Sequence, residues 1–320
     1  MGDVIHALPV VTDLLAARPG LTLDWVVEEG FAELPRLHPG VREVVPVAIR
    51  RWRRALGQAA TWAEIRAVRA RLRAGRYDLA LDLQGLVKSA LVARWTGAPV
   101  AGFSRACARE PLAALAYAQR FDVPADLHAI ERLRVLAAQA LDYTVQGLPR
   151  FALTAPPLAL DWLPAGPYAV FLHATSRAEK QWPAAHWHAL GRALLKQGVS
   201  VVLPWGGVAE QQAAQGLAQA IQSDLTQATA IVAPRLTLSA CARLLADARA
   251  VVGVDTGLTH LSAALEVPTV ALFAATPAWR YGPYWTERAR NLGENGVWPS
   301  AAQVLSTLAD LGVPERGRIE

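Results

Sequence analysis

Residues 251–260 read Val251-Val252-Gly253-Val254-Asp255-Thr256-Gly257-Leu258-Thr259-His260, and this stretch decides the fold class. A valine-rich apolar run ends at Asp255, which is typical of a strand buried in a parallel sheet. Thr256 is a residue type that begins helices as an N-cap, and a helical pattern follows over residues 258–265. The stretch therefore predicts a strand that passes directly into a helix, as in a βαβ unit.

The same alternation of apolar strands and amphipathic helices extends in both directions from this stretch. In the second half, the expected strands are residues 168–173, 200–204, 228–232, 250–254 and 269–273, with helices at 185–196, 209–221, 239–246 and 258–265. In the first half, the expected strands are residues 22–27, 43–47, 79–83 and 100–103, with helices at 4–16, 61–74 and 87–95. Five prolines between positions 149 and 167 separate the two series. We predict an α/β protein with two Rossmann-like, doubly wound domains, 1–150 and 151–320, that face each other across a cleft.

Composition excludes several classes of protein. A chain of 320 residues that is 53% hydrophobic and 18% charged is neither one small module nor a disordered chain. The longest apolar runs are far shorter than the roughly 20 residues that cross a bilayer, and no secretory signal is visible at the start. Cys107 and Cys241 stand far apart without metal-ligand spacing, so we expect a reducing, cytoplasmic environment and no structural zinc.

In an open α/β sheet, ligands bind outside the carboxyl ends of the strands. No strand candidate is followed by a GxGxxG or GxxxxGK[ST] motif, so a phosphate must be held in another way. Gly257 leaves the first amides of its helix uncovered, and His260 lies one turn beyond Thr256. These residues, with Asp255, form a candidate anion site. An ordinary helix cap, with the glycine for close packing, explains the same residues equally well.

Two further loops follow expected strands. After residues 168–173, Thr175 and Ser176 could donate to a diphosphate, and Lys180 could add a positive charge. Glu210, at the start of the helix over 209–221, could accept hydrogen bonds from sugar hydroxyls, although a first-turn glutamate also stabilises any helix. Asp3 stands at the start of the helix over 4–16, where an aspartate is usually a solvated cap.

Positive charge is concentrated in one part of a chain whose net charge is +5. Residues 42–76 contain ten arginines against only two glutamates, and the densest group is Arg50, Arg51, Arg53 and Arg54. Guanidinium groups suit phosphate and carboxylate ligands, so an acidic partner is one interpretation and a solvated face is the other. A nucleic-acid site is disfavoured, because a single aromatic residue interrupts the arginines and no recognisable module surrounds them.

Together these stretches resemble glycosyltransferase family 9, and within it the branch of the first lipopolysaccharide heptosyltransferases. The matching segments include residues 1–4, 24–31, 47–53, 84–89, 109–113, 173–183, 203–206 and 254–260. They run in order over nearly the whole chain. Asp-Thr-Gly-Leu-x-His is similar to the family in general, whereas Trp-Val-Val-Glu-Glu-Gly-Phe and Ala-Ile-Arg-Arg-Trp-Arg look specific to this branch.

The resemblance implies a role for individual residues, with Asp3 as the catalytic base. The implied donor-binding residues are Thr175, Ser176, Lys180, Glu210, Leu236, Asp255, Thr256, Gly257 and His260. The implied acceptor-binding residues are Arg50, Arg53, Arg54 and Arg109. Ser176 replaces what is commonly a second threonine and keeps the hydroxyl. Leu236 takes the place of an apolar side chain over the adenine, although ordinary core packing would also explain it.

The resemblance further implies a GT-B fold and an inverting reaction that needs no metal and no cofactor. It would move L-glycero-D-manno-heptose from ADP-heptose to a Kdo (3-deoxy-octulosonate) sugar of Kdo2-lipid A, at the cytoplasmic face of the inner membrane, with no nucleic-acid partner. Family members carry about ten residues ahead of the Met-Gly-Asp, so the first strand of the N-terminal domain is expected to be missing here. The alternatives are a family 9 transferase with another acceptor and a catalytically impaired ADP-sugar-binding protein.

Overall fold

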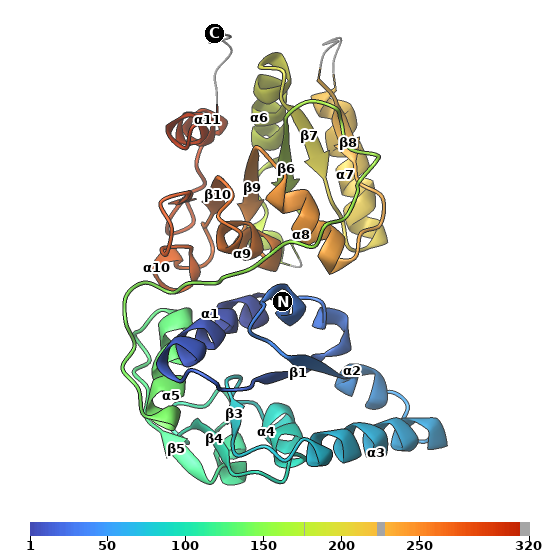
Figure 1. Ribbon diagram of the computed structural model, residues 1–320. Coiled ribbons are helices and arrows are strands. Elements are labelled where there is room, and N and C mark those ends of the chain that lie inside the picture. The colour runs from blue at the N-terminus through green and yellow to red at the C-terminus, as the bar shows by residue number, and fades with distance from the viewer. Residues whose placement is uncertain (176, 223–227, 314–320) are drawn as a thin grey trace. The chain divides into compact units, whose positions relative to one another are not determined.

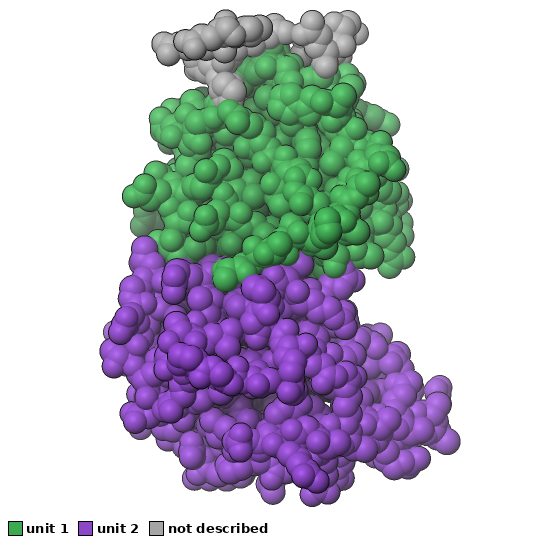
Figure 2. Space-filling model, viewed as in Figure 1, with its two compact units in different colours: residues 1–5, 152–320 green, residues 6–151 purple. Residues whose placement is uncertain are grey.

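The computed structural model describes residues 1–175, 177–222 and 228–313. These described residues form two compact units: those within 6–151 make up the N-terminal unit, and those within 152–320, together with residues 1–5, make up the C-terminal unit (Figure 2). Residues 142–167 contain no helix or strand, as the prolines in this segment predict.

The C-terminal unit is built on one parallel sheet (Figure 1). Its strands are β6 (Tyr168–Leu172), β7 (Ser200–Leu203), β8 (Ala230–Val232), β9 (Ala250–Val254), β10 (Thr269–Leu272) and β11 (Ala289–Leu292). Its helices are α6 (Ala184–Lys196), α7 (Val208–Ile221), α8 (Leu238–Ala246), α9 (Gly257–Ala264), α10 (Ala278–Tyr281) and α11 (Ala301–Asp310). The order β11-β10-β9-β6-β7-β8 is that of a dinucleotide-binding Rossmann sheet, since it reads 3-2-1-4-5-6 from the other edge when the unit's own strands are numbered. The predicted doubly wound architecture is confirmed for this unit.

Helices cover the central strands, which are therefore apolar along their whole length. Every residue of β6, β7, β9 and β10 is buried. Trp187, Leu190 and Leu194 recur at helical spacing on α6 and pack against the sheet in the same core cluster. This core fixes the carboxyl ends of the central strands, from which the candidate site is built.

The N-terminal unit has its strands in two separate parallel sheets. The first pairs β1 (Asp24–Glu28) with β2 (Glu43–Val47), and the second has the order β3 (Ala80–Asp82), β4 (Val100–Phe103), β5 (Gln119–Phe121). The helices are α1 (Gly2–Ala17), α2 (Ile49–Trp52), α3 (Ala59–Ala74), α4 (Val87–Arg94) and α5 (Ala129–Leu141), with 3-10 helices η1 (Glu29–Phe31), η2 (Pro35–Leu37) and η3 (Pro111–Ala116). Within the described residues no strand joins β1 to β3.

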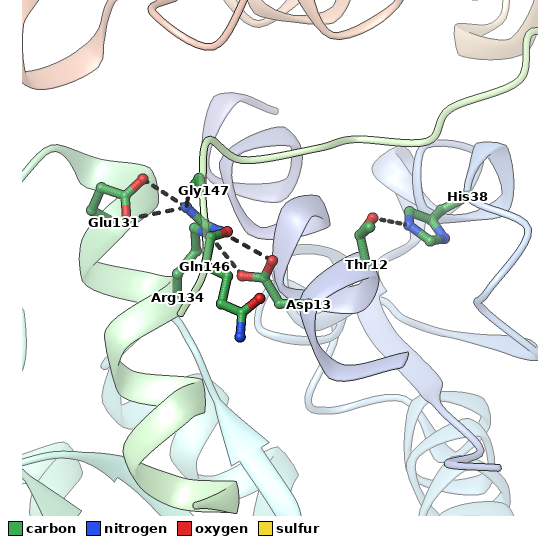
Figure 3. A network of polar contacts seen from close by, with 7 residues as sticks. All are labelled: Thr12, Asp13, His38, Glu131, Arg134, Gln146 and Gly147. Carbon is green, nitrogen blue, oxygen red and sulfur yellow. Dashed lines mark hydrogen bonds and ion pairs between the residues drawn. The ribbon is translucent and has the colours of Figure 1, made fainter. Parts of the chain in front are cut away.

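A buried arginine ties together three segments of the N-terminal unit (Figure 3). The Arg134 side chain, on α5, is only 1% exposed. Its Nε and Nη2 donate to the two oxygens of Asp13 on α1, at 2.7 and 3.1 Å. Its Nη1 and Nη2 also donate to the carbonyls of Gly147 and Gln146, each at 3.0 Å, and Nη1 reaches Glu131. Because every donor group has an acceptor, the buried charge is fully compensated.

Candidate functional site

The strand order of the C-terminal unit reverses between β6 and β9, so the carboxyl ends of these two strands flank the switch point at which α/β sheets bind ligands. The two strands pair directly, with Leu172 opposite Gly253. The loop after β6 contains Thr175 and Lys180, and α9 follows β9 almost at once. Two stretches that are about 75 residues apart in sequence therefore meet at one edge of the sheet.

Asp255 is the centre of the site. Its Oδ2 accepts hydrogen bonds from Lys180 Nζ at 2.5 Å and from Thr276 Oγ1 at 2.6 Å. Its Oδ1 lies 3.2 Å from His260 Nε2. Since an ionised carboxylate can only accept, Nε2 of the imidazole carries the hydrogen in this contact. Sequence reasoning placed three of these residues at strand ends, and the structure joins them through one carboxylate.

The surroundings keep Asp255 ionised although it is mostly buried. Burial by itself raises the pKa of this carboxyl, but the hydrogen bonds from His260, Lys180 and Thr276 outweigh burial and hold the pKa far below its ordinary value. The group therefore stays negative at neutral pH. It orients the Lys180 ammonium, of which only one N–H is used by this bond, so that the others remain available for a ligand.

Thr276 was missed by the sequence analysis. It lies two residues beyond the buried Phe273-Ala274 stretch that follows β10, the strand next to β9. A hydroxyl close behind a predicted strand was the available signal, because polar groups after neighbouring parallel strands meet at one edge.

The start of α9 differs from the expected cap. Thr256 is at the N-cap position, as predicted, but its side chain makes no hydrogen bond to a helix amide. Its Oγ1 instead lies 3.2 Å from Thr259 Oγ1, and Thr259 donates to the carbonyl of Val254 at 2.7 Å. This pair of threonines locks the strand-to-helix turn and leaves the first amides of α9 without a side-chain cap.

The other predicted donor residues in the described ranges follow β6, β7 and β8 along the chain. Glu210 is in the first turn of α7, where its Oε2 accepts from the amide of Gly206 at 2.7 Å. Leu236 is half-buried in the loop between β8 and α8. Thr175 accepts a long bond, 3.4 Å, from the amide of Arg177, and Ser176 lies outside the described residues. Hydrogen bonds thus connect Lys180, Asp255 and His260. Strand order brings Glu210, Leu236 and Thr175 to the same edge of the sheet.

A histidine not assigned by sequence reasoning stands among these groups. His173 directly follows β6, and neither ring nitrogen has a hydrogen-bond partner within the described residues. Burial lowers its pKa, and this effect outweighs that of the nearby Glu210 charge, which raises it. The imidazole is therefore neutral at neutral pH and lies close to Glu210.

Asp3 is exposed in the first turn of α1. Residues 1–5 group with the C-terminal unit, where a Cβ built on Gly2 would lie 3.9 Å from Cδ2 of His260. A Cβ on Gly257 would come within 2.5 Å of the Met1 side chain, so a larger residue here would have to displace Met1. Gly2, the residue next to Asp3 in sequence, therefore lies near His260 at the edge of the Asp255 cluster.

The arginines of the N-terminal unit fall into different settings. A cavity of about 610 Å³ is lined by Arg50, Arg51 and Arg54, together with three glutamates and Phe31. Arg53 is exposed and does not line this cavity.

Arg109 is exposed and lies beside the turn at Gly85, since a Cβ added to Gly85 would be 3.3 Å from the amide nitrogen of Arg109. Arg109 does not line the cavity either. Buried Asp82 fixes this turn by accepting from the amides of Gln84 and Gly85 and from Tyr117 Oη at 2.6 Å. The four predicted acceptor residues are thus not all brought to one cavity.

No group of three or more His, Cys, Asp or Glu side chains in the described ranges is arranged to hold a metal ion. No helix in this part of the chain is long and apolar enough to cross a membrane.

Comparison with known proteins places this geometry among glycosyltransferases. Residues 65–307 match the model of glycosyltransferase family 9 (heptosyltransferase). The chain is 49% identical over 286 residues to lipopolysaccharide heptosyltransferase 1 of Pseudomonas aeruginosa, covering 89% of this chain and 79% of that protein.

Two solved structures of the Escherichia coli heptosyltransferase WaaC are similar along nearly the whole chain. The structure with ADP has a TM-score of 0.86 at 39% identity, covering 97% of this chain and 96% of that one. The structure with ADP-2-deoxy-2-fluoro heptose has a TM-score of 0.81 at 40% identity, with the same coverage.

Proposed function

Because the chain belongs to glycosyltransferase family 9, we propose that it transfers L-glycero-D-manno-heptose from ADP-heptose to a Kdo sugar of Kdo2-lipid A, with inversion at the anomeric carbon and without a metal. The chain is a GT-B glycosyltransferase, a heptosyltransferase of lipopolysaccharide core biosynthesis. The observation that best supports the proposed transfer from ADP-heptose is the Asp255 cluster at the switch point of a Rossmann sheet.

We assign the diphosphate of the donor to this cluster. Lys180 supplies a positive charge that Asp255 holds in place, and the uncapped amides at the start of α9 supply hydrogen-bond donors. Negative charge grows on the ADP as the bond between the anomeric carbon and the phosphate oxygen breaks. Fixed donors aimed at that charge lower the barrier, as a metal ion does in other transferases.

The rest of the donor is assigned to the neighbouring strand ends. Glu210 would accept hydrogen bonds from sugar hydroxyls through the carboxylate oxygen that its bond to Gly206 leaves available. Leu236 would cover the adenine, and Thr175 and Ser176 would donate to the phosphates. Similarity to a WaaC structure with ADP supports a nucleotide ligand for this chain.

We assign Asp3 as the general base. Inverting transfer needs one base that takes the proton of the acceptor hydroxyl while its oxygen bonds to the anomeric carbon and the ADP leaves from the opposite face. A carboxylate is a weak base for a sugar hydroxyl, so it removes this proton late, once the hydroxyl has become acidic in the transition state. The position of Gly2 beside His260 supports this role for its neighbour Asp3.

The acceptor is assigned to the arginines of the N-terminal unit. Kdo carboxylates and lipid A phosphates are anionic, and guanidinium groups bind such ligands through paired hydrogen bonds. Arg50 and Arg54 line a cavity large enough for a sugar, while Arg53 and Arg109 would contact the acceptor outside it. An acceptor anchored in lipid requires that the enzyme act at the membrane surface, so we propose peripheral association with the cytoplasmic face.

Replacing Lys180 by Ala tests the donor assignment. We expect the affinity for ADP-heptose to fall roughly 10- to 100-fold, since a charge-assisted hydrogen bond contributes about 1.5–3 kcal/mol. Titration calorimetry with ADP-heptose measures this change directly. Lys180→Arg should restore part of the affinity, and Lys196→Ala, an exposed lysine at the end of α6, should leave it unaltered. Full affinity in Lys180→Ala would remove the diphosphate from this cluster.

A further inference from the structure

Three neighbouring arginines line the cavity of the N-terminal unit, but one of them is already occupied by carboxylates. Arg51 Nε and Nη2 donate to the two oxygens of Glu29, each at 3.1 Å, and Arg51 Nη1 donates to Glu64 at 3.1 Å. Arg50 and Arg54 have no ion pair within the described residues. The Arg50 guanidinium lies over the ring of Phe31, 5.8 Å from its centroid. The charge of Arg51 is thus compensated within the protein, whereas those of its two neighbours are available to a ligand.

These arginines stand on or just after α2, which has only four residues and cannot be stable by itself. The helix is held from outside. Glu28 accepts from the amide of Arg50 at 3.1 Å, and so satisfies one of the donors that a helix start leaves open. Glu64, on α3, accepts from Arg51 and also from the indole Nε1 of Trp52 at 2.8 Å. One carboxylate therefore binds two consecutive side chains of α2.

Arg51, Glu29 and Glu64 form a clamp on α2, and Glu64 remains ionised at neutral pH while Arg51 is present. Hydrogen bonds from Arg51 and from Trp52 hold the pKa of Glu64 below its ordinary value. The guanidinium reaches Glu29 through two parallel N–H groups, a geometry that lysine cannot reproduce. The clamp thus depends on the shape of the arginine side chain as well as on its charge.

We propose that Arg51 is a positioning residue, which joins α2 to Glu29 and Glu64 and so fixes the places of Arg50 and Arg54 in the cavity. It does not itself bind the acceptor. The inference rests on the proposed function, in which Arg50 and Arg54 bind anionic groups of the acceptor. It adds that the cavity needs Glu29 and Glu64 to bind an anionic ligand, because these glutamates hold α2 in place through Arg51.

If the glutamates act as a clamp, neutralising one of them should change acceptor affinity in the direction opposite to that expected from its charge alone. Removing a negative charge from a cavity that binds an anion should, by electrostatics alone, tighten binding. If Glu64 instead holds α2 in place, its neutral variant should weaken acceptor binding. The neutral variant of Glu29, the other carboxylate that binds Arg51, should weaken acceptor binding for the same reason.

The experiment compares Glu64→Gln, Glu29→Gln, Arg51→Met and Arg51→Lys in the full chain, with Kdo2-lipid A and ADP-heptose as substrates. We expect each of the first three to raise the KM for the acceptor about tenfold, with kcat and donor affinity within about twofold of the parent. Arg51→Lys should recover only part of the loss. The double variant Arg51→Met/Glu64→Gln should be no worse than Arg51→Met, because both changes open the same clamp.

A second exposed ion pair provides the matched control. Arg71 and Glu43 pair in the same unit, with side chains 49% and 41% exposed, and neither lines the cavity. Arg71→Met and Glu43→Gln should leave the KM for the acceptor unchanged. Melting temperatures should stay close to that of the parent in all these variants, since exposed ion pairs contribute little to global stability.

Arg50→Met, measured beside them, separates failure of the inference from failure of the proposed function. A raised KM in Arg50→Met together with an unchanged or lowered KM in Glu64→Gln would overturn the clamp alone. An unchanged KM in Arg50→Met would overturn the acceptor assignment and the clamp with it. Equal losses for both substrates with a lowered melting temperature would show that Arg51 merely supports the fold, and this also overturns the inference.

Discussion

Asp3→Asn should lower turnover by about 10²- to 10⁴-fold and leave the affinity for ADP-heptose within about twofold of the parent. The amide keeps the size and polarity of the carboxylate but cannot take the proton of the acceptor hydroxyl. Because this proton moves only near the transition state, the loss belongs to kcat and not to donor binding. Single-turnover rates with saturating substrates, together with calorimetric titration of the donor, measure the two quantities separately.

Asp310→Asn is the matched control for this variant, because it removes an exposed carboxylate from α11 in the same unit. Its turnover should equal that of the parent. Loss of less than about fivefold in Asp3→Asn, with the control unaffected, would show that another group accepts the proton. Loss of donor affinity in Asp3→Asn would instead assign this residue to the donor site.

Arg134→Met should destabilise the N-terminal unit by about 3–5 kcal/mol, the usual effect of removing one partner from a buried ion pair. The substitution leaves the Asp13 carboxylate and the carbonyls of Gln146 and Gly147 without their common donor (Figure 3). Urea unfolding followed by hydrogen exchange resolves the two units, and the shift should be confined to residues 6–151.

Arg134→Lys should be nearly as unstable as Arg134→Met, since one ammonium cannot reach an aspartate and two carbonyls in the geometry of a guanidinium. Arg71→Met removes an exposed arginine from the same unit and should change stability by less than about 1 kcal/mol. Equal stability of the Arg134→Met and Arg71→Met variants would contradict the structural role assigned to the buried network.

The strands that the sequence predicted best are rich in buried apolar residues. The expected strands over residues 43–47, 100–103 and 250–254 coincide with β2, β4 and β9. No strand was predicted for β5 or β11, which lie at sheet edges and contain polar residues such as Gln119 and Asn291. An edge strand need not be apolar, so hydrophobic pattern alone does not find it.

The sequence predicted where the residues of the candidate site lie along the chain, but it did not predict which of them are in contact. Sequence patterns placed Lys180 and Asp255 after two different strands. Their ion pair follows from the direct pairing of β6 with β9, which depends on the strand order of the whole sheet. Thr276 joined the cluster for the same reason.

The arginines give the opposite example. As sequence, Arg50, Arg51 and Arg54 are equivalent members of one basic group. Only the positions of Glu29 and Glu64, which come from other elements, divide them into a compensated arginine and two that are available to a ligand. The division depends on tertiary packing, and no local spacing rule reports it.

The central claim is that this chain joins heptose from ADP-heptose to Kdo2-lipid A. Incubating the purified chain with both substrates in buffer containing excess EDTA, and following the lipid by mass spectrometry, tests it most directly. We expect Kdo2-lipid A to gain the mass of one heptose residue as ADP is released in equal amount. A lipid of unchanged mass under conditions in which ADP-heptose binds, or product formed only after a divalent metal is restored, would contradict the account.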